Sequence, residues 1–294
     1  MSPEEASANR FQAPSDEVER ALQQALSKAE YDEWDAAAEL LRGALEDHPD
    51  DPYVLCWLGL AERELGLDGI AYERFKRALE QEPSDPTLLA TAGNAIAAFD
   101  DPAAEAALRT AAMTAPDLPR ARWMYGAYLA REGMTAEALE ELDAALALDP
   151  EDPVIHLERG VAQSFAEDLD GAAFSFTRAI ELNPSDGWTR ILLGLAYLEL
   201  DELQESMGML EEGARHRPED VEAQLLAALA LTVGGWEDRA FEMLERARLQ
   251  VDELDRSLVL EVEGLIEDGS EPCLRFLKSS IGPSSFRARM LERP

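Results

Sequence analysis

The residues best suited to chemistry in this 294-residue sequence are three histidines and two cysteines, namely His48, His156, His216, Cys56 and Cys273. No spacing among them is that of a zinc site, and two distant cysteines form no disulfide framework. Cys56 lacks a recognisable base, so we interpret it as a small packing residue rather than a nucleophile. The sequence also lacks a phosphate-binding glycine loop, a zinc-protease helix and a nucleophile elbow. We therefore expect no metal, no cofactor and no catalytic activity.

The net charge of -35 narrows the classes of partner. A polyanion repels phosphate backbones and anionic lipid surfaces, so neither nucleic acid nor a membrane is an expected partner. The acidic residues could attract a basic partner. They could equally serve solubility and helix capping, as charged runs on solvated faces usually do.

No part of the sequence resembles a targeting or membrane segment. No apolar run approaches the roughly 18 residues that a membrane-spanning helix needs. The first five residues, Met-Ser-Pro-Glu-Glu, are acidic and polar rather than basic and apolar. The expectation is a cytoplasmic protein.

A repeat of about 34 residues is the strongest pattern in the sequence. Glycines at 59, 93, 126, 160 and 194 are separated by 34, 33, 34 and 34 residues. Prolines at 49, 83, 116, 150, 184 and 218 keep the same period, with the same short step. Small residues run in parallel at Ala44, Ala78, Ala111, Ala145, Ala179, Gly213 and Ala247.

Each repeat reads as two helices, and residues 52–85 show why. Leu55, Leu58 and Leu65 recur at helical spacing, and Gly66 can end this helix by adopting a left-handed conformation. A second helix carries its apolar residues on one face, from Ile70 to Leu79. Aspartate followed by proline starts the next helix, since aspartate caps free amides and proline suits the first position. This pair occurs at Asp51-Pro52, Asp85-Pro86 and Asp152-Pro153.

The pattern resembles the tetratricopeptide repeat. It matches at Leu58-Gly59, Ala71, Phe75, Ala78 and Pro83, and again at Tyr125-Gly126, Ala138, Leu142, Ala145 and Pro150. The resemblance implies an all-α fold, a right-handed α-α superhelical solenoid. We place seven repeats at 18–51, 52–85, 86–118, 119–152, 153–186, 187–220 and 221–254. The third is one residue short near Asp100-Asp101-Pro102, which predicts either a tight turn or a kink that reshapes the groove.

The ends of the chain lie outside the repeats. Residues 1–17 are polar and lack a helical period, so we expect a disordered tail. Residues 255–281 predict a capping pair of helices. Residues 282–294 form a basic tail, part of a stretch from Pro272 to Pro294 that has five basic residues and one acid. This tail is either a frayed end or a segment that docks on the solenoid or a partner, with Phe286, Met290 and Leu291 as apolar anchors.

The resemblance also implies where a partner would bind. In solenoids of this family the first helix of each repeat lines a concave groove. Helical phase then predicts a largely apolar groove face that carries tryptophan and arginine, the residue types that dominate interfaces. The alternatives are that some of these residues face the neighbouring helix, or that the C-terminal segment fills the groove. Its residues are Leu60, Arg63, Asn94, Arg120, Trp123, Leu157, Val161, Trp188, Ile191, Leu195, Leu198, Leu225 and Leu229.

The expected function is that of a scaffold or adaptor that binds a peptide or helix of a basic or amphipathic protein partner. One known use of the family, clamping the C-terminal carboxylate of heat-shock chaperones, is disfavoured. Asn94 is suitably placed, but Ala90, Met124, Val154 and Glu158 stand where that clamp needs polar or basic groups. The alternatives are a structural or regulatory subunit of a larger complex and a self-assembling scaffold.

Overall fold

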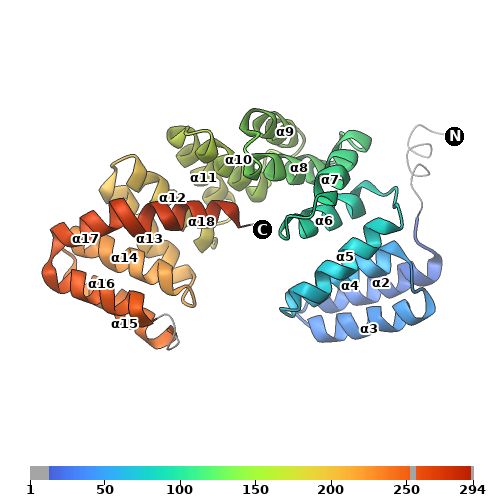
Figure 1. Ribbon diagram of the computed structural model, residues 1–294, viewed down its shortest axis with the longest axis horizontal. Helices are drawn as coiled ribbons and strands as arrows, with labels where there is room; N and C mark the ends of the chain where they lie inside the picture. The colour runs from blue at the N-terminus through green and yellow to red at the C-terminus, as the bar shows by residue number, and fades with distance from the viewer. Residues whose placement is uncertain (1–12, 252–255, 293–294) are drawn as a thin grey trace. The chain divides into compact units, whose positions relative to one another are not determined.

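The computed structural model describes residues 13–251 and 256–292, in which helices follow one another in pairs and no strand occurs (Figure 1). We call the first and second helix of each pair the A helix and the B helix. The A helices are α2 (Asp16–Ala29), α4 (Pro52–Glu64), α6 (Pro86–Ala97), α8 (Pro119–Arg131), α10 (Pro153–Phe165), α12 (Gly187–Glu199) and α14 (Val221–Val233). The B helices are α3 (Trp34–Asp47), α5 (Asp68–Glu80), α7 (Ala103–Thr114), α9 (Thr135–Leu148), α11 (Leu169–Leu182), α13 (Leu203–His216) and α15 (Glu237–Gln250).

Aspartate caps the N-terminus of most A helices. The side chains of Asp51, Asp85, Asp152, Asp186 and Asp220 each accept a hydrogen bond from a backbone N–H in the first turn that follows. These bonds satisfy amides that have no partner within the helix. The caps predicted from the three Asp-Pro pairs are confirmed, and part of the chain's acidity is therefore capping chemistry.

A residue with positive φ lies two or three residues after the end of each A helix. These residues are Asp32, Gly66, Asp100, Gly133, Glu167, Asp201 and Gly235. In the third repeat, the first buried residue of the B helix, Ala104, comes four residues after the positive-φ residue Asp100. In the second repeat the corresponding residue, Ala71, comes five residues after Gly66. The residue missing from the third repeat is thus lost from the turn between its helices. In that turn Asp101 accepts a hydrogen bond from the Ala103 amide at 2.9 Å.

Close packing of A and B helices explains the periodic glycines. A Cβ atom on Gly160 would lie 2.5 Å from Phe176, and one on Gly59 would lie 3.0 Å from Phe75. Both phenylalanines are fully buried. An alanine at either glycine would have to push an aromatic ring aside, so glycine is required by contact rather than by backbone conformation.

The chain divides into two compact units, Met1–Tyr128 (unit 1) and Leu129–Pro294 (unit 2), and helix α8 spans the division. Each unit has its own apolar core. In unit 1 the cores centre on Leu41, Leu58 and Phe75, and in unit 2 one continuous core runs from Val161 to Met290. No helix in the described ranges is long and apolar enough to cross a membrane.

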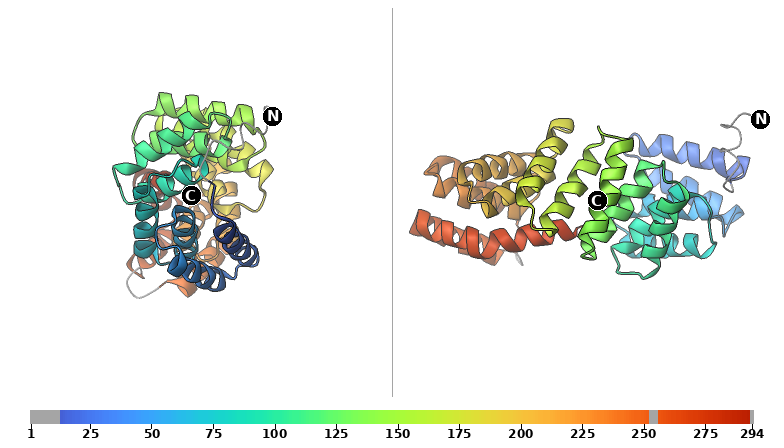
Figure 2. Two further views of the ribbon diagram at one scale, coloured as in Figure 1. Left: turned by 90° about the vertical axis from the view of Figure 1, so that its right-hand side faces the viewer. Right: turned by 90° about the horizontal axis from the view of Figure 1, so that it is seen from above.

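Four further helical segments follow the last repeat. They are α16 (Arg256–Asp268), α17 (Ser270–Phe276), the π-helical segment η1 (Leu277–Ile281) and α18 (Gly282–Leu291). Gly269, with φ of 103°, separates α16 from α17. Figures 1 and 2 show residues 270–291 as one continuous rod.

The boundaries at the two ends differ in part from those expected. Helix α2 begins at Asp16, within the predicted tail 1–17, and Ser15 caps it by accepting from the Val18 amide. The first twelve residues of that tail lie outside the described residues. At the other end, residues 282–291 of the predicted basic tail are helical.

Candidate functional site

In unit 2 the C-terminal rod lies on the A helices. Helix α18 packs against α12, whereas α17 and η1 pack against α14. Leu277, Ile281, Phe286 and Met290 from the rod belong to the same buried apolar cluster as the side chains of these A helices. The A-helix face of the last repeats is therefore covered by a helix of the same chain.

The predicted groove residues of the sixth and seventh repeats, apart from Trp188, are buried in the apolar cluster to which the rod contributes. Ile191, Leu195, Leu198, Leu225 and Leu229 are all buried, none more than 3% exposed. Leu198 lies directly beneath α18, because a Cβ atom on Gly282 would come within 2.6 Å of its Cδ2. These leucines form a packed interface rather than an open surface.

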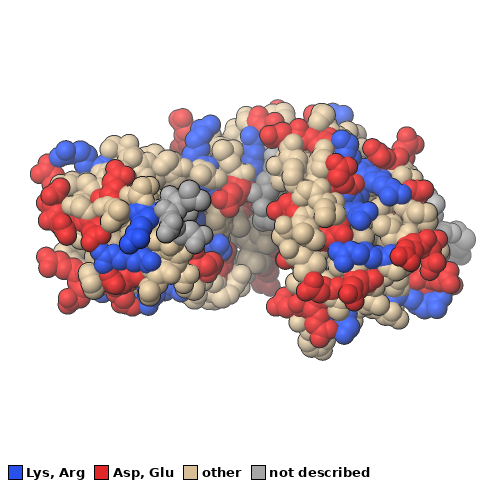
Figure 3. All heavy atoms as spheres, turned by 60° about the horizontal axis from the view of Figure 1, so that its bottom comes forward, with Lys and Arg blue, Asp and Glu red and all other residues tan. Residues whose placement is uncertain are grey.

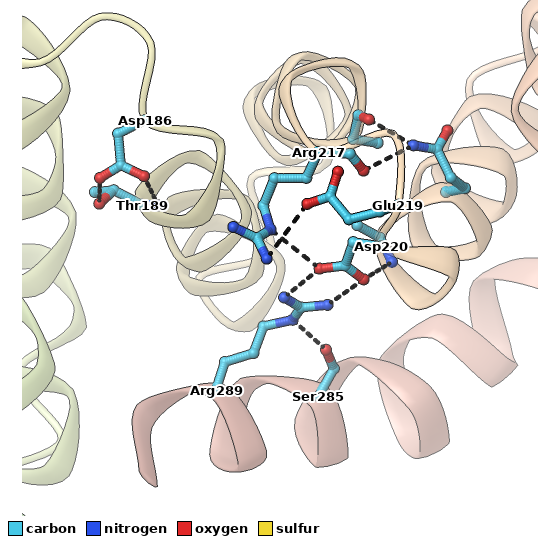
Figure 4. A network of polar contacts seen from close by, with 10 residues as sticks. Asp186, Thr189, Arg217, Glu219, Asp220, Ser285 and Arg289 are labelled. Atoms are coloured by element: carbon cyan, nitrogen blue, oxygen red, sulfur yellow. Dashed lines mark hydrogen bonds and ion pairs between the residues drawn. The ribbon is translucent and has the colours of Figure 1, made fainter. Parts of the chain in front are cut away.

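One ion pair ties α18 to the repeats, as Figure 4 shows. The Arg289 guanidinium donates to both carboxylate oxygens of Asp220, at 2.8 and 3.0 Å, and to the Ser285 hydroxyl at 3.1 Å. The Cζ atom of Arg289 also lies 4.8 Å from the ring centroid of Trp188. The Cζ atom of Arg217 lies 5.3 Å from the same centroid. Arg289 is 6% exposed, so the charge is buried with its partners. Paired, two-bond recognition of this kind is strong and directional.

The ionisation of Asp220 follows from these contacts. Burial raises the pKa of its carboxyl, but hydrogen bonding to Arg289, the charge of Arg289 and the hydrogen bond from the Ala223 amide lower it by more. The net result is a pKa below the ordinary value, so Asp220 is ionised at neutral pH. The Arg289–Asp220 pair is a true ion pair there.

The far end of α18 is held by Arg131 of α8. Arg131 donates to the backbone oxygen of Glu292 at 2.7 Å and to the carboxylate of Glu158 at 2.6 Å. A cavity of about 330 Å³ adjoins this contact, and we call it the unit 2 cavity. The predicted groove residues Leu157, Val161 and Trp188 line it, together with Arg131, Glu158, Asp186, Arg217, Arg289 and Glu292.

Unit 1 has a second cavity, of about 340 Å³, which we call the unit 1 cavity. The predicted groove residues Leu60 and Arg120 line it. The other lining residues, from α2, α4, α6 and their turns, are Pro14, Glu19, Leu22, Gln23, Leu26, Tyr53, Cys56, Trp57, Asp85, Thr87, Leu88 and Thr91. No helix of unit 1 comparable to α18 covers it within the described residues.

Three other predicted groove residues in unit 1 do not line this cavity. Asn94 and Trp123 are buried, at 6% and 8% exposure. The Arg63 Nη2 atom lies 3.9 Å from Oε1 of Glu64, its neighbour in sequence. Helical phase alone therefore does not separate residues on the open surface from residues that pack between adjacent helices.

The groove residues predicted from helical phase do not include Tyr53 and Asp85. The Tyr53 hydroxyl donates to Asp85 at 2.9 Å, and both side chains line the unit 1 cavity. Burial raises the pKa of Tyr53, and the hydrogen bond to Asp85 and its charge raise it further. Tyr53 occupies the repeat position of Trp188, two residues after the capping aspartate, so the sequence did contain a signal.

Neither cysteine is activated as a nucleophile in this structure. Burial raises the pKa of the Cys56 thiol to about 12, the charge of Asp85 adds to the rise, and Arg63 opposes it. Burial likewise raises the pKa of Cys273 to about 11. Both thiols are protonated at neutral pH and hence weak nucleophiles. Within the described ranges, no group of three or more His, Cys, Asp or Glu side chains could hold a metal ion.

Charge is spread over both units. Figure 3 shows acidic side chains across one face of each, with lysine and arginine between them. Several arginines form ion pairs with buried glutamates. Glu62, for example, is 2% exposed and contacts Arg42 and Arg74, both at 3.2 Å. The excess negative charge is consequently a property of the surface.

Paired helices of fixed length, capped by aspartate and packed through glycine, define an α-solenoid repeat protein. Three family models, each described as a tetratricopeptide repeat, match residues 22–86, 119–162 and 166–230, which together make up more than half of the chain. The chain belongs to the tetratricopeptide-repeat family. The sequence matches none of the curated proteins compared with it.

Solved structures show the same fold. The crystal structure of the APC/C hetero-tetramer Cut9-Hcn1 has a TM-score of 0.65 and 20% identity over 81% of this chain and 48% of that chain. The chain therefore spans about half the length of that relative. The crystal structure of PilW, described as a widely conserved type IV pilus biogenesis factor, has a TM-score of 0.58 and 20% identity over 70% of this chain and 96% of that chain.

Proposed function

We propose that this protein is a non-catalytic scaffold that holds a helical segment of a partner protein against the A helices of unit 1. The observation that supports this proposal is the contact between α18 and α12 in unit 2, because there the A-helix face of this chain accommodates a helix. Repeats of one family share their packing geometry, so a similar face in unit 1 can do the same. Solenoids of this kind commonly use such extended surfaces for binding.

The open apolar surface in unit 1 supports the choice of that unit. Leu26 is 36% exposed, and Trp57 and Leu60 are half-buried. All three line the unit 1 cavity. Its volume of about 340 Å³ lies in the range of roughly 300–1,000 Å³ that is common for ligand sites.

Partner capture with a Leu60→Asp variant tests this function. A charge at the cavity wall should remove the captured partner, because an unpaired carboxylate in an apolar contact is strongly unfavourable. Met113→Asp is the matched control, since Met113 of α7 is 75% exposed and does not line the unit 1 cavity. If Leu60→Asp retains the same partners as the wild-type chain while remaining folded, the proposed binding surface is wrong.

The alternative is a structural or regulatory subunit, or a scaffold that assembles with itself. The Cut9-Hcn1 structure is that of a hetero-tetramer, which illustrates the subunit role for a protein of this fold. Self-assembly is favoured by exposed apolar side chains on the last helices, where Phe241, Leu249 and Leu260 are 58%, 82% and 58% exposed. Sedimentation velocity over a range of concentrations separates a self-assembling scaffold from a subunit of a larger complex. In the purified protein, only self-assembly makes the sedimentation coefficient rise with concentration.

A further inference from the structure

The way α18 is held in unit 2 defines a recognition site for arginine. Two side chains from successive repeats form it: Trp188, two residues after the cap Asp186, and Asp220, the cap of the next A helix. The Arg289 guanidinium lies against the Trp188 ring and is hydrogen-bonded to both oxygens of Asp220. An aromatic ring and a capping carboxylate, 32 residues apart, thus hold one arginine of a docked helix.

Unit 1 has the same two positions. Tyr53 stands two residues after the cap Asp51, and Asp85 is the cap of the next A helix, again 32 residues from the aromatic residue. The two side chains are in contact, since the Tyr53 hydroxyl donates to Oδ2 of Asp85 at 2.9 Å. Both line the unit 1 cavity. The repeat therefore places an equivalent pair beside an open surface.

Asp85 retains the capacity to bind a cation. Its Oδ1 accepts from the amides of Thr87 and Leu88, and its Oδ2 accepts from Tyr53. A carboxylate has about four acceptor sites, so at least one remains. No lysine or arginine in the described ranges lies within ion-pair distance of Asp85. Among the described residues, only neutral donors compensate its negative charge.

The apolar surroundings also correspond. Beneath α18, Leu195 and Leu198 share a buried cluster with Phe286 and Met290, which lie three residues before and one residue after Arg289. In the unit 1 cavity, Leu60 occupies the repeat position of Leu195. Leu22, Leu26, Trp57 and Leu88 extend the apolar wall. At the charged positions of the lining, Glu19 and Asp85 outnumber Arg120.

We propose that the unit 1 cavity binds an amphipathic helix of a partner protein through an arginine that stacks on Tyr53 and pairs with Asp85. Apolar side chains three residues before and one residue after that arginine then pack on Leu60, Trp57 and Leu26. This inference rests on the proposed function, and it specifies the chemistry of the partner. Helix α18 in unit 2 is the internal example of such a ligand.

A blocked peptide of residues 280–292 is the probe, titrated onto the full-length protein by fluorescence anisotropy. The chain's own α18 keeps its place in unit 2, because a tethered segment competes at an effective concentration of order millimolar. Asp85→Asn preserves the N-cap of α6 and removes the charge. It should weaken peptide binding about tenfold or more, the loss expected for one charge-assisted contact.

The controls isolate the arginine contact. Asp51→Asn makes the same change at a cap that does not line the cavity, so it should leave the affinity unchanged. A peptide with Arg289→Gln should bind as weakly to the wild-type chain as the normal peptide binds to Asp85→Asn, with no further loss when both changes are combined. Tyr53→Phe should bind as tightly as the wild-type chain or more tightly, because it keeps the ring and frees Oδ2, whereas Tyr53→Ala should bind less tightly.

Each contrary outcome has a definite meaning. Absence of peptide binding up to millimolar concentration, or binding that is equally tight in Asp85→Asn, overturns the arginine site. If Leu60→Asp abolishes peptide binding while Asp85→Asn does not, the proposed scaffold function stands and only the arginine recognition is wrong. A photoreactive group on the peptide that labels α12 or α14 instead of α2 or α4 would assign binding to displacement of α18, which also overturns the unit 1 assignment.

Discussion

Arg289 makes a buried ion pair that fixes the position of α18 on the repeats. It is buried, bonded to both oxygens of Asp220 and stacked on Trp188. A buried guanidinium that loses its partner carboxylate keeps its desolvation cost without the compensating attraction. The contact between α18 and the repeats is therefore sensitive to single substitutions at either end of this pair.

Asp220→Asn tests this dependence, because asparagine still caps α14 but no longer carries a charge. We expect a loss of about 1.5–3 kcal/mol in the stability of the docked α18, the range for a hydrogen bond to a charged group. Hydrogen exchange of the amides in residues 282–291 measures it. Asp152→Asn, the same change at the cap of α10, is the control and should leave that exchange unaltered.

The same pair predicts an acid dependence. Asp220 has a folded-state pKa below its ordinary value, so ionisation stabilises the folded chain above the ordinary value of about 3.9. This contribution is lost as the pH falls from about 4 through the lower folded-state value. Urea titrations give the free energy of unfolding of the wild type and of Asp220→Asn. This free energy should differ between the two by a large amount at pH 7 and by a smaller amount at pH 3. An equal difference at the two pH values would contradict the stabilising role of the ionised Asp220.

At the scale of the helix, glycine has two different roles that alanine substitution separates. Gly160→Ala places a methyl group 2.5 Å from Phe176 and should cost about 1–3 kcal/mol through overpacking. Gly43→Ala in α3 meets nothing within 4 Å and should stabilise by about 0.5–1 kcal/mol through higher helix propensity. Chemical denaturation of the two variants should give free-energy changes of opposite sign.

Removal of the whole of α18 should have a larger effect. A chain that ends at Ile281 loses the burial of Phe286 and Met290, worth about 3–6 kcal/mol at roughly 1.5–3 kcal/mol for each side chain. It should melt at a lower temperature and bind more of a hydrophobic dye than the full chain, since Leu195 and Leu198 become accessible. Arg287→Gln, at an exposed position of the same helix, should change neither reading.

Sequence patterns predicted the elements well and their mutual contacts less well. The repeat period, the aspartate caps and the left-handed Gly66 all depend on residues near one another in the chain, and each is confirmed. The contact of Arg289 with Asp220 joins residues 69 positions apart and belongs to no periodic pattern. Phase alone likewise did not show that Trp123 is buried, because burial there depends on the neighbouring helices.

At the scale of the whole molecule, the charge of -35 should make stability depend on salt. Like charges repel in the compact state, and the Debye length falls from about 30 Å at 0.01 M to about 8 Å at 0.15 M. We expect the urea midpoint to rise over this range, because the excess of 61 acids over 26 bases outweighs the exposed ion pairs that salt also weakens. A midpoint that falls with added salt would show that the ion pairs dominate.

The docking of the last helix on α12 also has a consequence for the synthesis of the chain. Leu195 through Leu229 leave the ribosome more than fifty residues before Phe286, the residue that helps to cover them. At about 5–20 residues per second, the apolar strip of the sixth and seventh repeats stays uncovered for roughly 3–18 seconds in every new molecule. During that interval the nascent protein exposes an aggregation-prone surface, which closes only after α18 has been synthesised.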